Sequence, residues 1–218
     1  MEEHRLSVRR TARYYTLDSE EEPREVWFVL HGYGQLAQYF IRHFEAIQNG
    51  RRLIVAPEAL SRYYLPGHQR VGASWMTKED RLTEVDDYLS YLDALHDEIF
   101  ERVDRRRVTV HVLGFSQGGA TASRWTTLGR VDADRLILWA SELAHDLDLT
   151  AHAEAIGRRA LTLVVGTEDE YVTPTLLAER EALLAEHHIP YRLHTFAGTH
   201  KIDADTLKVL VRNEGNDA

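Results

Sequence analysis

Short apolar runs alternate along the chain with longer segments in which apolar residues recur every three or four positions. The short runs predict strands at roughly 8–16, 26–30, 53–55, 108–113, 135–140, 161–165 and 191–196. The longer segments predict helices at roughly 36–48, 82–103, 117–129, 175–188 and 203–213. Because strands and helices alternate, the pattern predicts an α/β fold with a mostly parallel sheet. The first strand is polar and alternating, so we expect it at an edge of that sheet.

Length and charge narrow the class of protein. The 218 residues suit a single domain over 1–218, and their net charge of -9 argues against a nucleic-acid partner and against anionic membranes. No apolar run approaches the roughly 20 residues of a membrane span, and the first residues lack the apolar core of a signal peptide. We therefore expect a cytoplasmic protein without a membrane span. A homodimer stays an open alternative.

The chain contains no cysteine, which excludes disulfides, thiolate nucleophiles and zinc–thiolate sites. A His-Glu-x-x-His motif is also missing from the sequence. We therefore expect neither a metal nor another cofactor.

In parallel sheets, functional sites form at the carboxyl ends of the strands. Residues with reactive or polar side chains follow five of the predicted strands, in the segments 31–35, 56–58, 114–118, 166–170 and 197–200. Serine, carboxylates and histidine therefore lie on separate loops that face the same edge of the sheet.

Ser116 stands between two glycines, in Gly114-Phe115-Ser116-Gln117-Gly118, where a predicted strand gives way to a helix. This G-x-S-x-G pattern in that context is typical of a nucleophilic serine on a strained turn, where the following helix N-terminus favours a developing oxyanion. The alternative is a glycine-rich turn without chemistry.

A serine nucleophile needs an adjacent base, and the base needs a carboxylate that orients it. Among 12 histidines, His200 is the best candidate, because it follows the last predicted strand, whereas the loop at His31 suggests a shaping role. Four acids could supply the carboxylate: Glu168, Asp169 and Glu170 share one loop, and Glu142 follows another strand. The order serine, acid, histidine is that of the α/β-hydrolases.

The sequence resembles the carboxylesterase/phospholipase family of α/β-hydrolases, which includes the acyl-protein thioesterases. The resemblance covers nearly the whole chain and rests on LHGYGQ at 30–35, APEA at 56–59, SW at 74–75, GFSQGG at 114–119, GTEDEYVTP at 166–174 and GTH at 198–200. It implies an α/β-hydrolase fold with at most a minimal cap.

The resemblance also assigns roles to particular residues. It implies a triad of Ser116, Asp169 and His200, and it selects Asp169 because the family's aspartate loop matches there. The implied oxyanion donors are the backbone N–H groups of Tyr33 and Gln117. The family usually has His-Gly-Leu-Gly-Asp in the first loop, where this chain has Tyr33 and Gln35; the backbone donor survives this change, but the pocket is expected to differ.

The segment 59–81 is the only sizeable irregular stretch that the pattern predicts. Its apolar residues are expected to wall a substrate groove: Tyr63, Tyr64, Leu65, Trp75 and Met76. The alternative is that they only pin the loop to the core. We therefore expect a serine hydrolase of small or medium carboxylic esters. Acyl thioesters, lysophospholipids and peptides remain alternative substrates, and a catalytically silent scaffold is the alternative of another class.

Overall fold

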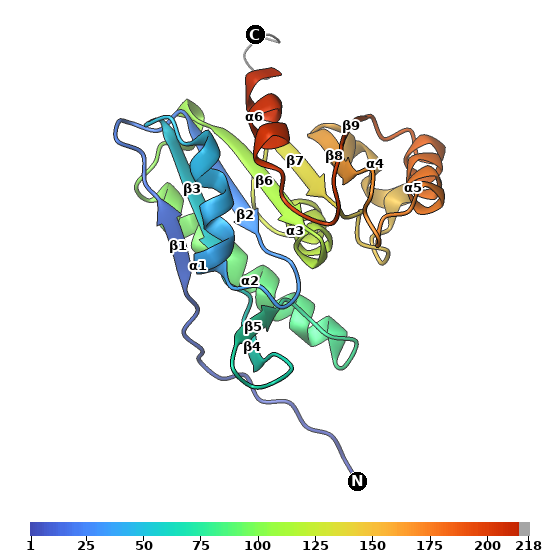
Figure 1. The fold of residues 1–218 in the computed structure, drawn as a ribbon. Coiled ribbons are helices and arrows are strands. Elements are labelled where there is room, and N and C mark those ends of the chain that lie inside the picture. The colour runs from blue at the N-terminus through green and yellow to red at the C-terminus, as the bar shows by residue number, and fades with distance from the viewer. Residues whose placement is uncertain (214–218) are drawn as a thin grey trace.

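The computed structural model describes residues 1–213 and contains a seven-stranded sheet with helices on both faces (Figure 1). The strands of this sheet are β1 Tyr14–Leu17, β2 Glu25–Leu30, β3 Arg52–Pro57, β6 Thr109–Phe115, β7 Arg135–Trp139, β8 Ala160–Gly166 and β9 Tyr191–Phe196. Their spatial order is β1-β3-β2-β6-β7-β8-β9, and every pair is parallel except β1 with β3. The predicted α/β class, and the edge position of the first strand, are confirmed.

The helices are α1 Ala37–Phe40, α2 Arg81–Phe100, α3 Gln117–Leu128, α4 Leu149–Gly157, α5 Pro174–Glu186 and α6 Ala204–Asn213, with short 3-10 helices η1 Ile41–Ile47 and η2 Arg105–Arg107. Alternate side chains of the central strands point to opposite faces, which divides the core in two. On one face, Phe28 of β2 packs with residues of α2 and α3, including Trp125. On the other, Trp27 packs with residues of α1, η1 and α6, including Phe44 and Leu207.

Several expected elements differ in extent. The first strand begins at Tyr14 rather than near residue 8, because its antiparallel partner β3 ends at Pro57, which lies opposite Tyr14. The segment 36–48 is a four-residue helix that continues as a 3-10 helix rather than one α-helix. The helix α4 was not predicted from the sequence, although its N-cap residue Asp148 accepts a hydrogen bond from the Ala151 amide.

The segment 59–81 is not irregular throughout, which corrects the prediction. It contains a two-stranded antiparallel hairpin, β4 Ser61–Tyr64 and β5 Val71–Ser74. This β4–β5 hairpin lies beside the loop that follows β2, since the Gly34 amide donates to the Ala73 carbonyl at 2.9 Å and the Ala73 amide donates to the Gln35 carbonyl at 3.0 Å. Short strands with polar residues give little periodic signal, so the pattern along the chain did not reveal them.

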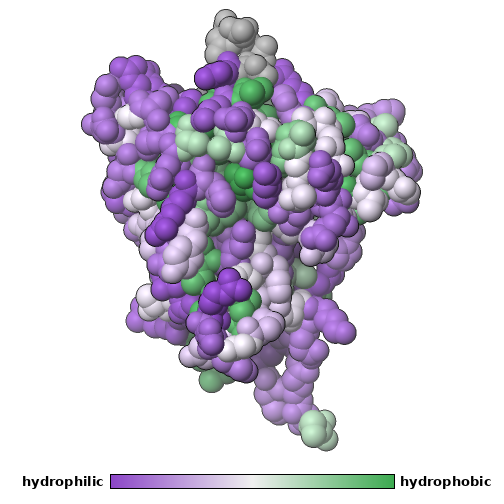
Figure 2. Space-filling view, in the orientation of Figure 1, coloured by the Kyte–Doolittle hydropathy of each residue, from purple (hydrophilic) through white to green (hydrophobic). Residues whose placement is uncertain are grey.

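Hydrophilic side chains predominate on the face seen in Figure 2, where hydrophobic side chains show only in small groups. Within residues 1–213, no helix is both long and apolar enough to cross a membrane.

Candidate active site

Ser116 occupies the turn between β6 and α3, with a backbone φ of 52° and ψ of -121°. A positive φ is costly for a residue with a side chain and persists only where the surroundings enforce it. Here the Ser116 amide donates to the Trp139 carbonyl at 2.9 Å, and the Ser116 carbonyl accepts from the Ser141 hydroxyl at 2.7 Å. Both anchors come from the neighbouring β7 and the residues that follow it, so the sheet itself holds the serine in its strained conformation.

The glycines around Ser116 are required by close backbone approach. A Cβ atom at Gly114 would lie 2.2 Å from the Gly118 carbonyl oxygen, and one at Gly118 would lie 2.3 Å from the Leu30 carbonyl oxygen. Neither distance is possible without moving backbone atoms. The G-x-S-x-G pattern therefore reflects contacts between β6, the start of α3 and the end of β2.

The loops after β8 and β9 bring Asp169 and His200 into contact. The His200 Nδ1 atom lies 2.9 Å from Asp169 Oδ2 and 3.1 Å from Oδ1. The Asp169 side chain is fully buried, and its Oδ1 also accepts the backbone N–H groups of Tyr171 at 2.9 Å and Val172 at 3.0 Å. These bonds fix the carboxylate and leave Oδ2 for the imidazole.

The other three acids considered from the sequence lie elsewhere. Glu168 and Glu170 are exposed, and Glu142 pairs with Arg180 at 2.8 Å. The structure therefore places only one of the four carboxylates, Asp169, against His200.

The His200 ring also packs against two aromatic rings. Its centroid lies 4.9 Å from that of Phe115, the residue before Ser116, and 4.7 Å from that of the exposed Tyr171. Phe115 thus links the histidine loop to the serine turn. Tyr171 was not singled out from the sequence, and only its position two residues after Asp169 could have drawn attention to it.

Two backbone N–H groups near Ser116 have no acceptor among residues 1–213: that of Tyr33, in the loop after β2, and that of Gln117, at the start of α3. The turn is closed by the Gln35 side chain, whose Oε1 accepts the Gly32 amide at 2.8 Å. An amide oxygen at position 35 thus makes the hydrogen bond that holds the turn, and the two free N–H groups remain available to an oxyanion.

His31 lies buried beneath this loop and shapes it, as predicted. Its Nε2 accepts the Ala59 amide at 3.1 Å, so Nδ1 carries the proton and donates to the Gly32 carbonyl at 2.8 Å. Burial lowers the pKa of His31 to about 4, which keeps the ring neutral near pH 7.

The Gln117 side chain makes a connection that the sequence did not indicate. Its Nε2 donates to the Met76 carbonyl at 2.8 Å, and its Oε1 accepts the Trp75 amide at 3.1 Å. The residue after Ser116 therefore binds the end of the β4–β5 hairpin to the start of α3.

The residues expected to wall a groove have different environments. Trp75 is only 2% exposed and donates its Nε1–H to the His31 carbonyl at 2.8 Å, which corresponds to the alternative of pinning the segment to the core. Met76 is half-buried next to Gln117, and Tyr63 lies with its ring 5.3 Å from that of Tyr33. Tyr64 is exposed on the hairpin.

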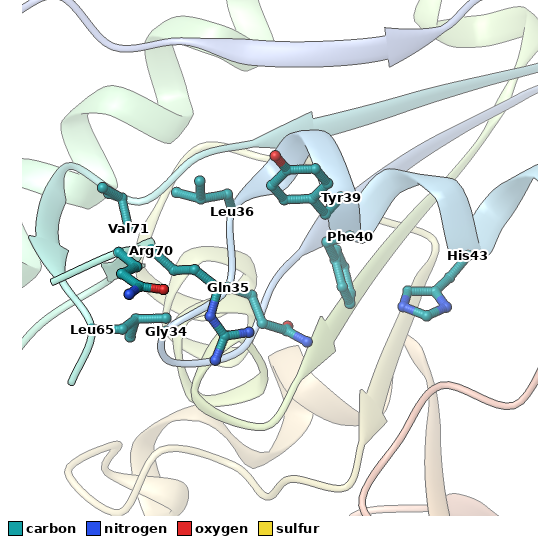
Figure 3. A pocket seen from close by; sticks show the side chains of 10 residues that line it. Gly34, Gln35, Leu36, Tyr39, Phe40, His43, Leu65, Arg70 and Val71 are labelled. Carbon is teal, nitrogen blue, oxygen red and sulfur yellow. The ribbon is translucent and has the colours of Figure 1, made fainter. Parts of the chain in front are cut away.

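A cavity of about 480 Å³ lies between the loop after β2, the helices α1 and η1, and the β4–β5 hairpin (Figure 3). We call it the hairpin cavity; its lining residues are Gly34, Gln35, Leu36, Tyr39, Phe40, His43, Leu65, Gln69, Arg70 and Val71. Of the residues expected to wall a groove, Leu65 lines this cavity, whereas Tyr63, Tyr64, Trp75 and Met76 do not. A second cavity, of about 610 Å³, lies between the N-terminal residues and α2.

No group of three or more histidine or acidic side chains suited to a metal ion occurs within residues 1–213.

Comparison with solved structures identifies the fold. The chain has a TM-score of 0.71 with the acyl-protein thioesterase 2 of Zea mays, at 15% identity over 94% of this chain and 98% of that one. It scores 0.72 with esterase PE8, at 20% identity over 93% and 98% of the two chains. It scores 0.72 with a carboxylesterase from Mesorhizobium loti, at 18% identity over 92% and 94%.

These matches show the class of protein: the chain has the α/β-hydrolase fold, and residues 1–213 add no large cap to it. Within that fold, the solved structures it resembles include carboxylesterases and an acyl-protein thioesterase. No family model and no curated sequence matches the chain.

Proposed function

We propose that the chain is a serine hydrolase that cleaves carboxylic esters of small or medium acyl chains through an acyl-enzyme. The observation that carries the proposal is the buried Asp169–His200 pair, which lies against the turn of a strained serine. An isolated serine on a tight turn could be structural, but a serine, an imidazole and a buried carboxylate at one sheet edge match the needs of nucleophilic catalysis.

In the proposed reaction, the Ser116 hydroxyl attacks the ester carbonyl while His200 Nε2 accepts its proton. Asp169 Oδ2 accepts the Nδ1–H of His200, which keeps Nε2 free as a base and stabilises the charged ring. The tetrahedral intermediate collapses as His200 gives the proton to the leaving alkoxide, and the alcohol departs. Water then attacks the acyl-enzyme while His200 accepts its proton, and a second tetrahedral intermediate forms. As that intermediate collapses, His200 returns the proton to the Ser116 oxygen and the acid is released.

The oxyanion of each tetrahedral intermediate would accept the N–H groups of Tyr33 and Gln117. Loss of one such donor costs about 3–4 kcal/mol of transition-state stabilisation in enzymes of this type. Gln35 and the β4–β5 hairpin fix the loop that carries Tyr33. The preorganisation of this donor thus depends on the turn rather than on the Tyr33 side chain.

Two features of the structure support the proposed substrate class. A short hairpin lies beside the loop after β2, and one face of the molecule offers hydrophobic side chains only in small groups (Figure 2). Both features suit dissolved esters better than aggregated lipids. An acyl thioester is the second candidate, favoured by the similarity to a plant acyl-protein thioesterase, because the same triad attacks both carbonyls.

A fluorophosphonate probe tests the nucleophile directly, since only an activated serine reacts with it. We expect the wild-type chain and a Ser90→Ala control, which changes an exposed serine on α2, to be labelled equally. A Ser116→Ala variant should take up no label and lose nearly all hydrolysis of a soluble ester. A folded Ser116→Ala variant that keeps more than a few per cent of the activity would overturn the proposal, and an unlabelled wild type would favour a silent scaffold.

A further inference from the structure

The hairpin cavity is placed where it could receive part of an ester substrate. Gly34 and Gln35, which directly follow the proposed oxyanion donor Tyr33, line one side of it. Arg70 and Val71 of the hairpin line the opposite side (Figure 3). The cavity therefore adjoins the loop that carries the proposed oxyanion donor Tyr33.

The charge of the lining is unusual for this chain. Asp and Glu number 35 against 26 Lys and Arg, yet no acidic residue lines the hairpin cavity. The second cavity, by contrast, is lined by Glu84 and Asp87. The hairpin cavity thus lacks the carboxylates that would repel an anion.

Two polar side chains of the cavity, Arg70 and Gln35, have hydrogen-bond donors that pair with no acceptor within residues 1–213. The Arg70 guanidinium has no carboxylate or other hydrogen-bond partner within residues 1–213. Gln35 uses its Oε1 to hold the Gly32 amide, so its Nε2 is left as a donor, also without an acceptor in the described chain. The Arg70 side chain reaches toward Gln35 across the cavity (Figure 3). A second guanidinium, that of Arg42, lies 5.3 Å from the ring of Tyr39 at the rim.

Apolar side chains complete the wall. Leu36, Phe40, Leu65 and Val71 can pack against a short carbon chain, while the donors lie among them. An arginine and a primary amide that both lack acceptors match a carboxylate better than they match a neutral group.

We propose that the hairpin cavity is a subsite for a carboxylate carried by the substrate, and that Arg70 is its recognition residue. This inference deepens the proposed function and rests on it. The preferred substrates are then small esters that bear a carboxylate a few carbons from the scissile carbonyl, in the first place monoesters of short dicarboxylic acids.

A matched pair of substrates tests the subsite: the mono-4-nitrophenyl ester of glutaric acid and the same compound with its free carboxyl methylated. We expect Arg70→Gln to lower kcat/KM for the charged ester about tenfold, mainly through KM, as for one charge-assisted hydrogen bond in a partly exposed site. With the same variant, kcat/KM for the methylated ester should change less than about twofold. Arg70→Glu should lower kcat/KM for the charged ester further, because it places a like charge in the cavity.

Arg106→Gln is the matched control, because it removes one positive charge from an exposed arginine before β6, at the opposite edge of the sheet. It should leave kcat/KM for both substrates unchanged, which separates a local contact from an effect of net charge.

An acetate ester of 4-hydroxybenzoate, with its carboxylate on the alcohol side, distinguishes an acyl subsite from a leaving-group subsite. A selective Arg70 effect on that ester instead would overturn the assignment to the acyl part.

Equal losses on charged and methylated esters, or no loss on either, would overturn the subsite while leaving ester hydrolysis intact. If the wild-type chain hydrolyses none of these esters, the proposed function fails and the subsite fails with it. Melting temperatures of all variants, read by circular dichroism, identify any loss that comes from unfolding.

Discussion

Replacing Asp169 with asparagine changes one atom of the proposed triad and leaves the shape of the side chain nearly intact. Asp169 Oδ1 accepts two backbone N–H groups, from Tyr171 and Val172, so the asparagine carbonyl oxygen will keep that position. The amide nitrogen then takes the place of Oδ2, 2.9 Å from His200 Nδ1. Because an NH₂ group only donates, Nδ1 must become the acceptor and the ring proton must move to Nε2.

A proton on Nε2 removes the base that Ser116 needs. In a well-studied serine protease the corresponding change lowers kcat by about 10⁴. We expect Asp169→Asn to lower kcat by at least about 10², equivalent to roughly 3 kcal/mol of transition-state stabilisation. The backbone bonds to Oδ1 persist, so the variant should fold.

The assay is kcat on one soluble ester for four single variants, with thermal unfolding as the check on folding. Glu142→Gln removes the charge of one ion pair, that with the mostly buried Arg180, and Glu168→Gln and Glu170→Gln alter exposed side chains. Each should change kcat less than about threefold. A folded Asp169→Asn variant with near-normal kcat, beside a crippled Glu142→Gln, would refute the assignment of the acid.

Four further predictions follow from the site. Gly118→Ala should lower kcat at least about tenfold, because its Cβ would meet the Leu30 carbonyl 2.3 Å away and displace the oxyanion donors; an unchanged rate would contradict this close approach. The His31 ring should titrate near pH 4 by NMR, and a midpoint above 6 would contradict a buried neutral ring. Because the fold lowers this pKa, the free energy of unfolding should fall by up to about 3 kcal/mol as the pH drops from about 6.5 to 4. Hydrolysis rates across 4-nitrophenyl esters should fall beyond medium acyl-chain length, and a steady rise to palmitate would count against this. Hydrolysis should also survive prolonged chelation, and a loss of activity that zinc restores would count against that.

Periodicity along the chain determined most of the architecture. Apolar runs and helical spacing reflect burial on one or both faces, so they predicted the seven strands of the sheet, and β9 has the bounds that the pattern gave it. The G-x-S-x-G stretch also predicted a strand-to-helix turn, since its glycines reflect contacts that any sheet of this kind imposes there. The roles of Ser116, Asp169 and His200 in catalysis stay predictions.

Tertiary structure alone decided which groups meet. From residue chemistry alone, four acids were candidates in the sequence, and only the family resemblance selected Asp169. The pairing of β8 with β9 and the backbone bonds to Asp169 bring that carboxylate to His200. The β4–β5 hairpin, the Gln117 contacts with it and the hairpin cavity depend on bonds between segments about 40 residues apart. Periodicity reports the environment of each residue relative to its near neighbours, whereas the partner of a polar side chain is set by how distant loops pack, which has no local signal.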